Sequence, residues 1–306
     1  MITKLDGEIT KSTKYTKYKK VLFVSVVYFV LFVSNISCRS SLPVPNNPPK
    51  RIISIVPNVT EILFAIGAGP QVVAVSTYDV EPPEVRSLPT VGALIDPDTE
   101  RIVSLRPDLV VTYGSQADLQ AQLTRASIPF FDYRHGGLDH IMVTMRALGA
   151  RTGHVDQAEK VARGLQAGID AVKNRVAGKP RPRTLLVFGR EPGSLRNVYA
   201  SAGRGFLHDM LVVAGGEDVL NDIEKESAQV STEMILARKP DVILELNSAS
   251  RLNEADLKAV VDPWMTLSSV PAVRNKRVII LNGPGLTVPG PRVLDGIDKM
   301  AKALHP

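Results

Sequence analysis

The chain has little of several features that define other classes of protein. Its 306 residues include a single cysteine, Cys38, so no disulfide can form within one chain. Aromatic residues make up only 5% and hydrophobic residues 44%, a balance typical of globular proteins outside the membrane. The apolar run from Val21 to Val33 is shorter than the roughly 20 residues that a membrane-spanning helix needs.

Motifs of common catalytic and nucleotide-binding sites are also missing. The sequence contains no Gly-Lys-Ser/Thr phosphate loop and no Gly-x-Ser-x-Gly nucleophile motif. The glycines of GAGPQV (67–72) follow a helix pattern and precede a strand pattern, which reverses the order of the dinucleotide fingerprint. We therefore predict a protein that is not an enzyme and has no resident cofactor, and we keep an enzyme as the weaker alternative.

Positive charge is concentrated at the start of the chain. The formal net charge is +6, and residues 1–20 hold six lysines against two acidic residues, a net +4. The rest of the chain therefore carries only 6 − 4 = +2. This remainder is too small to indicate a nucleic-acid partner.

The start of the chain has the pattern of a bacterial export signal. Its lysine-rich segment is followed by the apolar run, then by small residues and Cys38. We predict a signal peptide at 1–37 and a body in the periplasm or at the cell surface. The lone cysteine resembles the lipid-attachment site of bacterial lipoproteins. The alternative is an uncleaved N-terminal anchor in which Cys38 is a free thiol.

The exported part divides into four segments by its patterns. Residues 38–50 are rich in proline, serine and asparagine, which predicts an extended tether. Short β-branched runs alternate with helix patterns over 51–153 and again over 180–306. Between them, apolar residues spaced by three and four predict one long helix within 154–179. We expect two Rossmann-like three-layer α/β lobes with parallel sheets, joined by this single interdomain helix.

Helix starts can be placed from their capping residues. In the first lobe, Asn58 and Glu61 are spaced as a capping box. A second signal occurs twice, because TERIVSLRPDLVV begins at Thr99 and TEMILARKPDVIL at Thr232, an offset of 232 − 99 = 133. We expect the residues before these two segments, Asp98 and Ser231, to cap two short helices.

The repeated segment places Glu100 and Glu233 in the first turns of its two helices. The helix dipole favours a carboxylate there by about 0.3–1 kcal/mol, so local stability accounts for either residue alone. It accounts less well for matched glutamates in both lobes. Their pairing predicts two exposed anionic residues at equivalent places.

Candidate ligand-binding residues follow the predicted strands. Tyr78, Tyr113 and Tyr199 come after such strands, and open α/β sheets bind ligands at the carboxyl ends of their strands. Tyrosine offers a broad apolar face with a polar tip, although loop packing would explain each one alone. Arg190 and Arg204 lie in the same loops and would bind a ligand anion, or else a surface carboxylate.

The five histidines do not form a metal-binding pattern. His135 and His140 are separated by flexible glycines, and a metal site would need further convergent ligands. We therefore expect surface or capping histidines and no metal held by the protein itself.

The body from Arg51 to Pro306 resembles the iron-siderophore and cobalamin periplasmic-binding family, the capture proteins of ABC importers. The resemblance is carried, in order, by RIISIVPNVTEILFAIGAG, VAVSTYDVEPPEV, TERIVSLRPDLVV, GRGFLHDMLVVAGGEDVL, VSTEMILARKPDVIL and WMTLSSVPAVRNKRVIIL. It implies two α/β lobes joined by one long helix, with the ligand held between them. It also implies delivery of a small-molecule metal chelate to a permease dimer and its ATPase. We expect the protein to be monomeric.

The likeness is closest to the cobalamin-binding members, and it implies roles for individual residues. It suggests that Glu100 and Glu233 dock onto arginines of the permease. The positions that it places at the ligand are Tyr78, Asp79, Leu94, Tyr113, Tyr199 and Ser227, where Leu94 and Ser227 replace tryptophans. We expect capture of cobalamin or a related corrinoid. A ferric siderophore or haem is the alternative ligand, and a periplasmic enzyme is the weaker alternative class.

Overall fold

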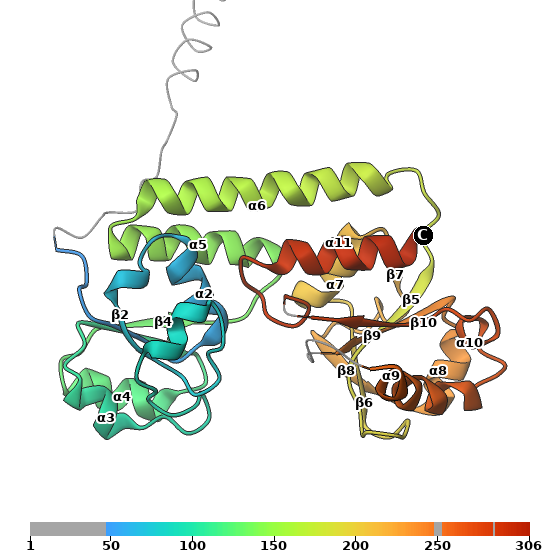
Figure 1. Ribbon diagram of the computed structural model, residues 1–306, viewed down its shortest axis with the longest axis horizontal. Helices are drawn as coiled ribbons and strands as arrows, with labels where there is room; N and C mark the ends of the chain where they lie inside the picture. The colour runs from blue at the N-terminus through green and yellow to red at the C-terminus, as the bar shows by residue number, and fades with distance from the viewer. Residues whose placement is uncertain (1–46, 248–252, 284) are drawn as a thin grey trace, which may run out of the picture. The chain divides into compact units, whose positions relative to one another are not determined.

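The computed structural model describes residues 47–247, 253–283 and 285–306 (Figure 1). These residues belong to one structural unit, Pro43–Pro306. The predicted signal peptide, lipidation of Cys38 and most of the predicted tether lie outside the described residues. Within the described part, none of the helices combines the length and apolar character needed to cross a membrane.

The amino-terminal lobe is built on a four-stranded parallel sheet with the strand order β2-β1-β3-β4. Its central strands, β1 and β3, are almost entirely buried, which explains their continuous apolar sequences. The strands are β1 (Ile52–Ser54), β2 (Val72–Val75), β3 (Leu109–Tyr113) and β4 (Phe130–Tyr133). The helices are α2 (Pro57–Ala65), η1 (Gly69–Gln71), η2 (Pro83–Ser87), α3 (Thr99–Ser104), α4 (Ala117–Arg125) and α5 (Leu138–Thr152).

The carboxy-terminal lobe has a mixed sheet with the order β10-β9-β5-β6-β8, and β7 pairs with β5. Strands β10, β9 and β5 are parallel, whereas β6 is antiparallel to both β5 and β8. The strands are β5 (Arg183–Gly189), β6 (Val198–Ser201), β7 (Glu217–Asp218), β8 (Ser227–Val230), β9 (Val242–Asn247) and β10 (Val278–Asn282). The helices are α7 (Gly205–Val213), α8 (Thr232–Arg238), α9 (Glu254–Val261), η3 (Asp262–Thr266), α10 (Pro271–Arg274) and α11 (Val293–Leu304).

The α/β class is confirmed, but the prediction of a wholly parallel sheet in the second lobe is wrong. The β5–β6 loop, residues 190–197, is too short for the crossover of about a dozen residues that parallel strands require. Strand β6 therefore turns back beside β5, and β8 extends the antiparallel edge.

The longest helix, α6 (Val155–Val176), lies within the segment predicted for it. It packs along α5 of the first lobe and α11 of the second (Figure 1), and it buries the apolar stripe that the spacing predicted. The lobes also meet without it, because the Leu138 N–H of α5 donates to Asp209 Oδ2 of α7 at 2.7 Å. Its role as the single link between the lobes, and the predicted segment boundaries, stay predictions.

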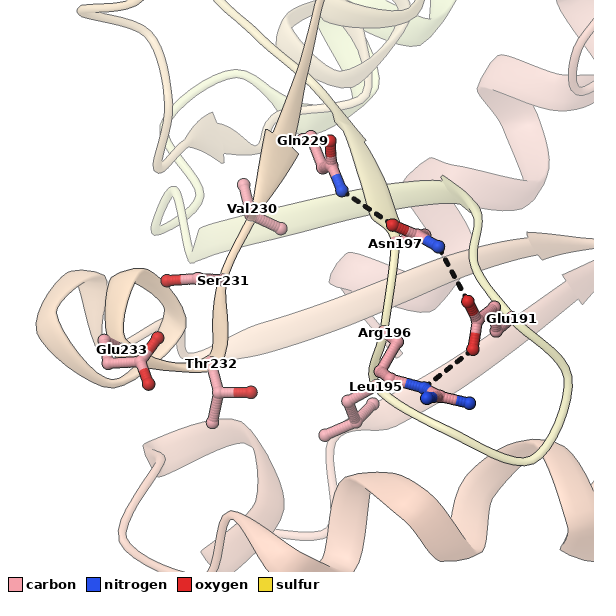
Figure 2. A pocket seen from close by; sticks show the side chains of 9 residues that line it. All are labelled: Glu191, Leu195, Arg196, Asn197, Gln229, Val230, Ser231, Thr232 and Glu233. Carbon is pink, nitrogen blue, oxygen red and sulfur yellow. Dashed lines mark hydrogen bonds and ion pairs between the residues drawn. The ribbon is translucent and has the colours of Figure 1, made fainter.

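The repeated segment forms the same local structure in both lobes. Asp98 and Ser231 each accept a hydrogen bond from the backbone N–H three residues later, at 2.9 and 3.2 Å, so both predicted caps are confirmed. Ser231 is visible at the start of α8 in Figure 2. Beyond the helices, Arg106 and Lys239 both adopt the left-handed conformation, with φ of 48° and 49°. The two segments, which are offset by 133 residues, thus share backbone conformation as well as sequence.

The aspartate of the repeated Pro-Asp pair connects the end of each short helix to the start of a neighbouring strand by hydrogen bonds. Asp108 accepts a hydrogen bond from the Arg51 N–H at 2.8 Å, and Asp241 accepts one from the Arg183 N–H at 3.2 Å. The guanidinium groups of these two arginines donate in turn to carbonyls at the ends of α3 and α8, both at 2.8 Å. These bonds give the repeated aspartates the same structural role in both lobes.

Asn58 and Glu61 do not form the predicted capping box. Helix α2 has Val56 as its N-cap and no side-chain cap, so both residues lie inside the helix. The Asn58 amide donates to the Pro289 carbonyl at 3.2 Å, and the Glu61 carboxylate accepts two bonds from Arg292 at 2.6 and 2.9 Å. They therefore attach the segment before α11 to the first helix of the amino-terminal lobe.

The Glu61–Arg292 pair should contribute to stability through its specific partner. Glu61→Gln alone should cost less than the roughly 3–5 kcal/mol of breaking a fully buried pair, because Arg292 keeps 26% of its side chain exposed. The double variant Glu61→Gln/Arg292→Met leaves no unpaired charge. Denaturant unfolding should therefore show that it is more stable than the sum of the single changes predicts. Strictly additive losses would show that the two side chains are not coupled.

Candidate functional site

Aromatic and imidazole rings gather at the carboxyl ends of β3 and β4. Tyr113 and Tyr133, the last residues of these strands, are register partners with ring centroids 6.1 Å apart. The His135 ring lies 5.1 Å from Tyr113 and 5.5 Å from Tyr133, and His140 lies 6.1 Å from Tyr133. We call these four residues the aromatic cluster.

Neighbouring elements hold the cluster in place. The Gln116 side chain accepts a bond from the Tyr113 N–H at 2.8 Å and donates to the Leu94 carbonyl at 2.6 Å. This links the loop that carries Leu94 to the end of β3. On the other side, the bond from Leu138 to Asp209 fixes the segment that follows β4 against helix α7. Both lobes therefore contribute to the position of the cluster.

The surroundings of Tyr113, Tyr133 and His135 favour the neutral form of each ring. Burial raises the pKa of Tyr133 to about 12 and also raises the pKa of Tyr113, and the charge of Glu226 from the second lobe acts in the same direction. Burial lowers the pKa of His135, which Glu226 opposes and His140 reinforces. The Tyr133 hydroxyl lies 3.3 Å from His135 Nδ1. The cluster therefore offers apolar ring faces together with hydrogen-bonding groups at their edges.

Tyr78 and Asp79 follow β2 as expected, but they differ in orientation. Tyr78 keeps 68% of its surface exposed, so it is free to meet a ligand. Asp79 turns inward, because its Oδ2 accepts a bond from the Ser76 N–H at 2.8 Å and its Oδ1 is buried without a partner among the described residues. Burial raises the pKa of the Asp79 carboxyl. Asp79 thus bonds within its own turn, and its contact with a ligand stays a prediction.

The three other predicted residues of the second lobe lie near the antiparallel edge. Tyr199 is within β6 rather than in a loop, and it is 43% exposed. Arg204 precedes α7 and forms an exposed ion pair with Glu224 at 2.5 Å. Ser227 begins β8 opposite Ser201. In the described part of the chain, no ring contact joins Tyr199 to the aromatic cluster.

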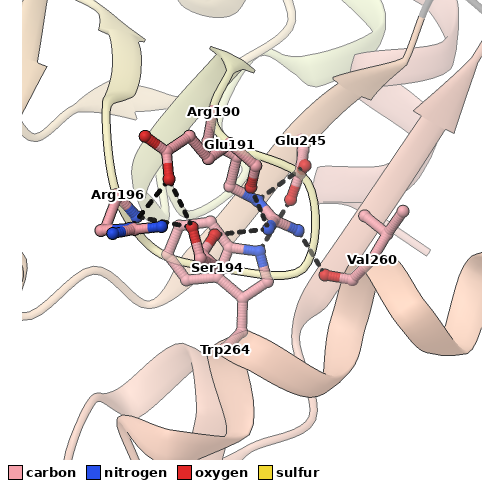
Figure 3. Close-up of polar contacts among 7 residues, drawn as sticks. All are labelled: Arg190, Glu191, Ser194, Arg196, Glu245, Val260 and Trp264. Carbon is pink, nitrogen blue, oxygen red and sulfur yellow. Dashed lines mark hydrogen bonds and ion pairs between the residues drawn. The ribbon is translucent and has the colours of Figure 1, made fainter.

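Arg190 is committed to internal contacts (Figure 3). Its Nε lies 3.0 Å from Glu245 Oε1, and the two side chains are only 4% and 12% exposed. The Trp264 indole donates to the other oxygen of Glu245 at 2.7 Å, and the guanidinium lies 5.5 Å from the Trp264 ring centre. Arg190 also donates to the carbonyls of Ser194 and Val260. Arg190 is therefore held by internal partners, and its contact with a ligand anion stays a prediction.

A hollow of about 590 Å³ lies at the carboxyl ends of β5 and β9. Its walls include Phe188, Arg190, Leu246, Val260 and Thr287. This volume falls within the range of roughly 300–1,000 Å³ that small-molecule sites occupy. The hollow lies at the carboxyl ends of strands in the second sheet, and the aromatic cluster lies at the carboxyl ends of strands in the first. The two therefore occupy corresponding positions, where open α/β sheets bind ligands.

Glu100 and Glu233 lie where the repeat predicted them, in the first turns of α3 and α8. Both side chains are exposed. The Ser231 hydroxyl and the backbone N–H of Glu233 lower the pKa of the Glu233 carboxyl. Within the described residues, Glu100 has no side-chain partner. Among the described residues, the local bonds of the repeat therefore give Glu100 no partner and give Glu233 only partners at the start of its own helix.

Tyr133, and the placement of His135 and His140 in the cluster, were not predicted from the sequence. Tyr133 ends the strand that pairs with β3, so matching the ends of neighbouring predicted strands would have placed it beside Tyr113. The histidines carry no such signal, because a loop and the start of α5 bring them back to the sheet edge. No group of three or more metal-ligating side chains is found in the described residues.

Comparison with known proteins places the chain in a family. A model described as periplasmic binding protein matches residues 52–284. The chain belongs to the periplasmic binding protein family. A vitamin B12-binding protein of Yersinia pestis is 29% identical over 257 residues, 83% of this chain and 86% of that protein. The resemblance found from the sequence motifs is thus confirmed.

Solved structures of the family share the fold. The periplasmic vitamin B12 binding protein of Vibrio cholerae matches with a TM-score of 0.71 and 26% identity, covering 84% of this chain and 97% of that one. A periplasmic heme-binding protein of Roseiflexus sp. RS-1 matches with a TM-score of 0.69 and 26% identity, covering 84% and 98%. By their names, these relatives are binding proteins rather than enzymes.

The position of Glu226 opposite the cluster can be tested by titrating His135. We expect its imidazole to titrate below the ordinary value of 6.5, because burial lowers this pKa. Glu226→Gln should lower the pKa further, since the negative charge that favours the imidazolium is removed. Histidine NMR titration, with the signal assigned through His135→Gln, measures both values. An unchanged pKa in Glu226→Gln would place this carboxylate away from the cluster.

The same shift makes stability depend on pH. The folded protein binds the His135 proton less readily than the unfolded chain does, so this stability is present above about pH 6.5 and is lost as pH falls below it. Thermal unfolding of the parent should therefore shift to lower temperature between pH 7 and pH 5, and His135→Gln should reduce that shift. The His305 pKa is lowered as well, so His305→Gln should also reduce the shift, and an unchanged shift in His135→Gln would contradict the prediction.

Proposed function

We propose that this protein is the extracytoplasmic substrate-binding component of an ABC importer and that it carries a corrinoid such as cobalamin. Two relatives named for vitamin B12 binding, at 29% and 26% identity over more than four fifths of the chain, support this choice. The protein catalyses nothing in this role. Export by residues 1–37 and attachment through Cys38 belong to the same proposal, as does a permease dimer with its ATPase as the partner.

The observation that carries the corrinoid assignment is the pairing of the two predicted arginines. Arg190 and Arg204 both form ion pairs with glutamates, at 3.0 and 2.5 Å. A haem or siderophore that bears carboxylates needs unpaired cations. The charge of Glu226 near the aromatic cluster also opposes such a ligand. A corrinoid carries carboxamide groups. Their N–H groups can donate hydrogen bonds to Glu226 and to acceptors of the aromatic cluster.

Haem remains the second candidate because of one feature of the cluster. Tyrosine and histidine are both axial ligands of haem iron in proteins, and the cluster contains two of each. The match to the Roseiflexus heme-binding protein supports the same alternative. In either case the ligand is a macrocyclic metal chelate, and the metal arrives with it.

Calorimetry of the protein without its leader distinguishes the two ligands. We expect one-to-one binding of cyanocobalamin with a dissociation constant of about 1 μM or tighter, or about −8 kcal/mol. Tyr113→Ala should weaken binding at least roughly tenfold because it removes a ring face, whereas Tyr113→Phe should change it by less than about threefold. Binding of haemin without cyanocobalamin would establish the haem alternative. Binding of neither would contradict the proposed ligand class.

The docking role of the two exposed glutamates is a separate prediction. Glu100→Lys together with Glu233→Lys should abolish stimulation of the permease-coupled ATPase, because opposite charges would then face the arginines proposed on the permease. Ligand affinity should stay unchanged. Asp156→Lys reverses an equivalent exposed acidic residue in the first turn of α6 and serves as the control. Full stimulation by the double variant would leave both glutamates with only their helix-dipole role.

A further inference from the structure

Helix α5 takes the acceptor for its first N–H group from the other lobe. Its own N-cap, Gly137, has no side chain to offer. The N–H groups of a helix's first turn lack partners within the helix, and a buried one without an acceptor is costly. Here the Leu138 N–H donates to Asp209 Oδ2 of α7 at 2.7 Å. The cap of α5 is therefore supplied from 71 residues further along the chain.

The two glycines before α5 are required by close contacts. A Cβ atom at Gly137 would lie 2.5 Å from Asp209 Oδ2, and one at Gly136 would lie 2.6 Å from the Cβ atom of His140. Both distances are shorter than side-chain atoms tolerate, so any other residue would displace the carboxylate or the histidine. The glycines between His135 and His140 therefore have a packing role at the junction of the lobes.

The helix that presents Asp209 is anchored inside the second lobe. One residue earlier on α7, His208 Nδ1 lies 3.1 Å from Asp218 Oδ2, and the Asp218 side chain is 0% exposed. The other oxygen of Asp218 accepts the Leu220 N–H at 2.9 Å. Helix α7 also packs against α5 (Figure 1). The position of the Asp209 carboxylate is thus set by the interior of the second lobe.

The bond from Leu138 to Asp209 lies between two members of the aromatic cluster. His135 comes three residues before Leu138, and His140 is in the first turn of α5. Their rings lie 5.5 and 6.1 Å from the ring of Tyr133. A shift of the Leu138 N–H relative to α7 would therefore move the backbone that carries both histidines. The bond couples the spacing of the lobes to the arrangement of the rings.

We propose that Asp209 is a positioning residue for ligand binding, which holds the aromatic cluster of the first lobe in register with the second lobe. The inference rests on the importer role proposed above and deepens it. A ligand captured between two lobes binds more tightly when their spacing is fixed beforehand, because less conformational entropy is lost on binding. Asp209 acts through α5 and the loop before it, without touching the ligand.

Two components of the contact can be separated by substitution. The negative charge of Asp209 is favourable at the start of α5, and Asp139, an exposed acidic residue of the same first turn, has the same interaction with the helix dipole. Asp139 makes no bond between the lobes. Asparagine at position 209 keeps an oxygen that accepts the N–H and loses the charge. Asp209→Asn and Asp139→Asn are therefore matched controls for Asp209→Ala.

The test combines calorimetry with cyanocobalamin and haemin and NMR of the histidine rings. Asp209→Ala should weaken binding of the chelate that the parent binds at least about fivefold, and it should shift the ring signals of His135 and His140. Gly137→Ala displaces the carboxylate from the opposite side and should act alike. The double variant should be no weaker than the weaker single variant, because both remove one contact. Asp209→Asn and Asp139→Asn should stay within about threefold of the parent.

Three results would contradict the proposal. Parent-like affinity and ring signals in Asp209→Ala, shown to be folded by circular dichroism, would reject the positioning role and leave the importer role intact. An equal loss of affinity in Asp139→Asn would assign the effect to charge at the start of the helix instead of the bond between the lobes. A parent protein that binds neither chelate would reject the proposed ligand class, and with it the role of Asp209 in binding.

Discussion

The second lobe depends on one buried carboxylate, Glu245, which is shared between the guanidinium of Arg190 and the indole of Trp264. Burying an ion pair is costly unless each polar group is satisfied, and here the guanidinium also reaches two backbone carbonyls. The result is a β5–β6 loop whose conformation is set from inside the lobe. Residues of this loop line two hollows of the lobe, the one at the ends of β5 and β9 and the one beside Glu233. A single internal pair thus helps to shape two separate parts of the surface of the lobe.

The repeated segment separates structural from functional residues within one stretch of sequence. The N-caps, the left-handed residues after the helices and the two aspartates that bind the next strand all have local hydrogen-bond roles. A residue with such a role is retained for folding whatever the protein does. Glu100 and Glu233 have no comparable task, and a dipole interaction of about 0.3–1 kcal/mol does not require glutamate at both positions. Glu100 and Glu233 are therefore exposed, matched residues of the repeat for which these local bonds give no reason.

The sequence was sufficient for features governed by neighbours along the chain and insufficient for features governed by distant partners. Strand and helix patterns, the caps Asp98 and Ser231 and the long helix depend on nearby residues, and the structure contains them. Asn58 and Glu61 have the spacing of a capping box, yet their partners lie 231 residues away. Arg190 looked free for a ligand until strand pairing brought Glu245, 55 residues later, against it. The aromatic cluster likewise exists only because β4 lies next to β3.

The same contrast between nearby and distant partners applies to the fold and the ligand. The sheets and their helices require only apolar residues in the right period, and proteins that carry different chelates share that requirement. Ligand choice depends instead on whether charges at the binding edge are paired. In this chain, Arg190 pairs with the buried Glu245 and Arg204 with the exposed Glu224, while the negative charge of Glu226 raises the pKa of Tyr113 and Tyr133. Charge balance at that edge, rather than the number of aromatic rings, is what separates a neutral amide-rich macrocycle from one that carries carboxylates.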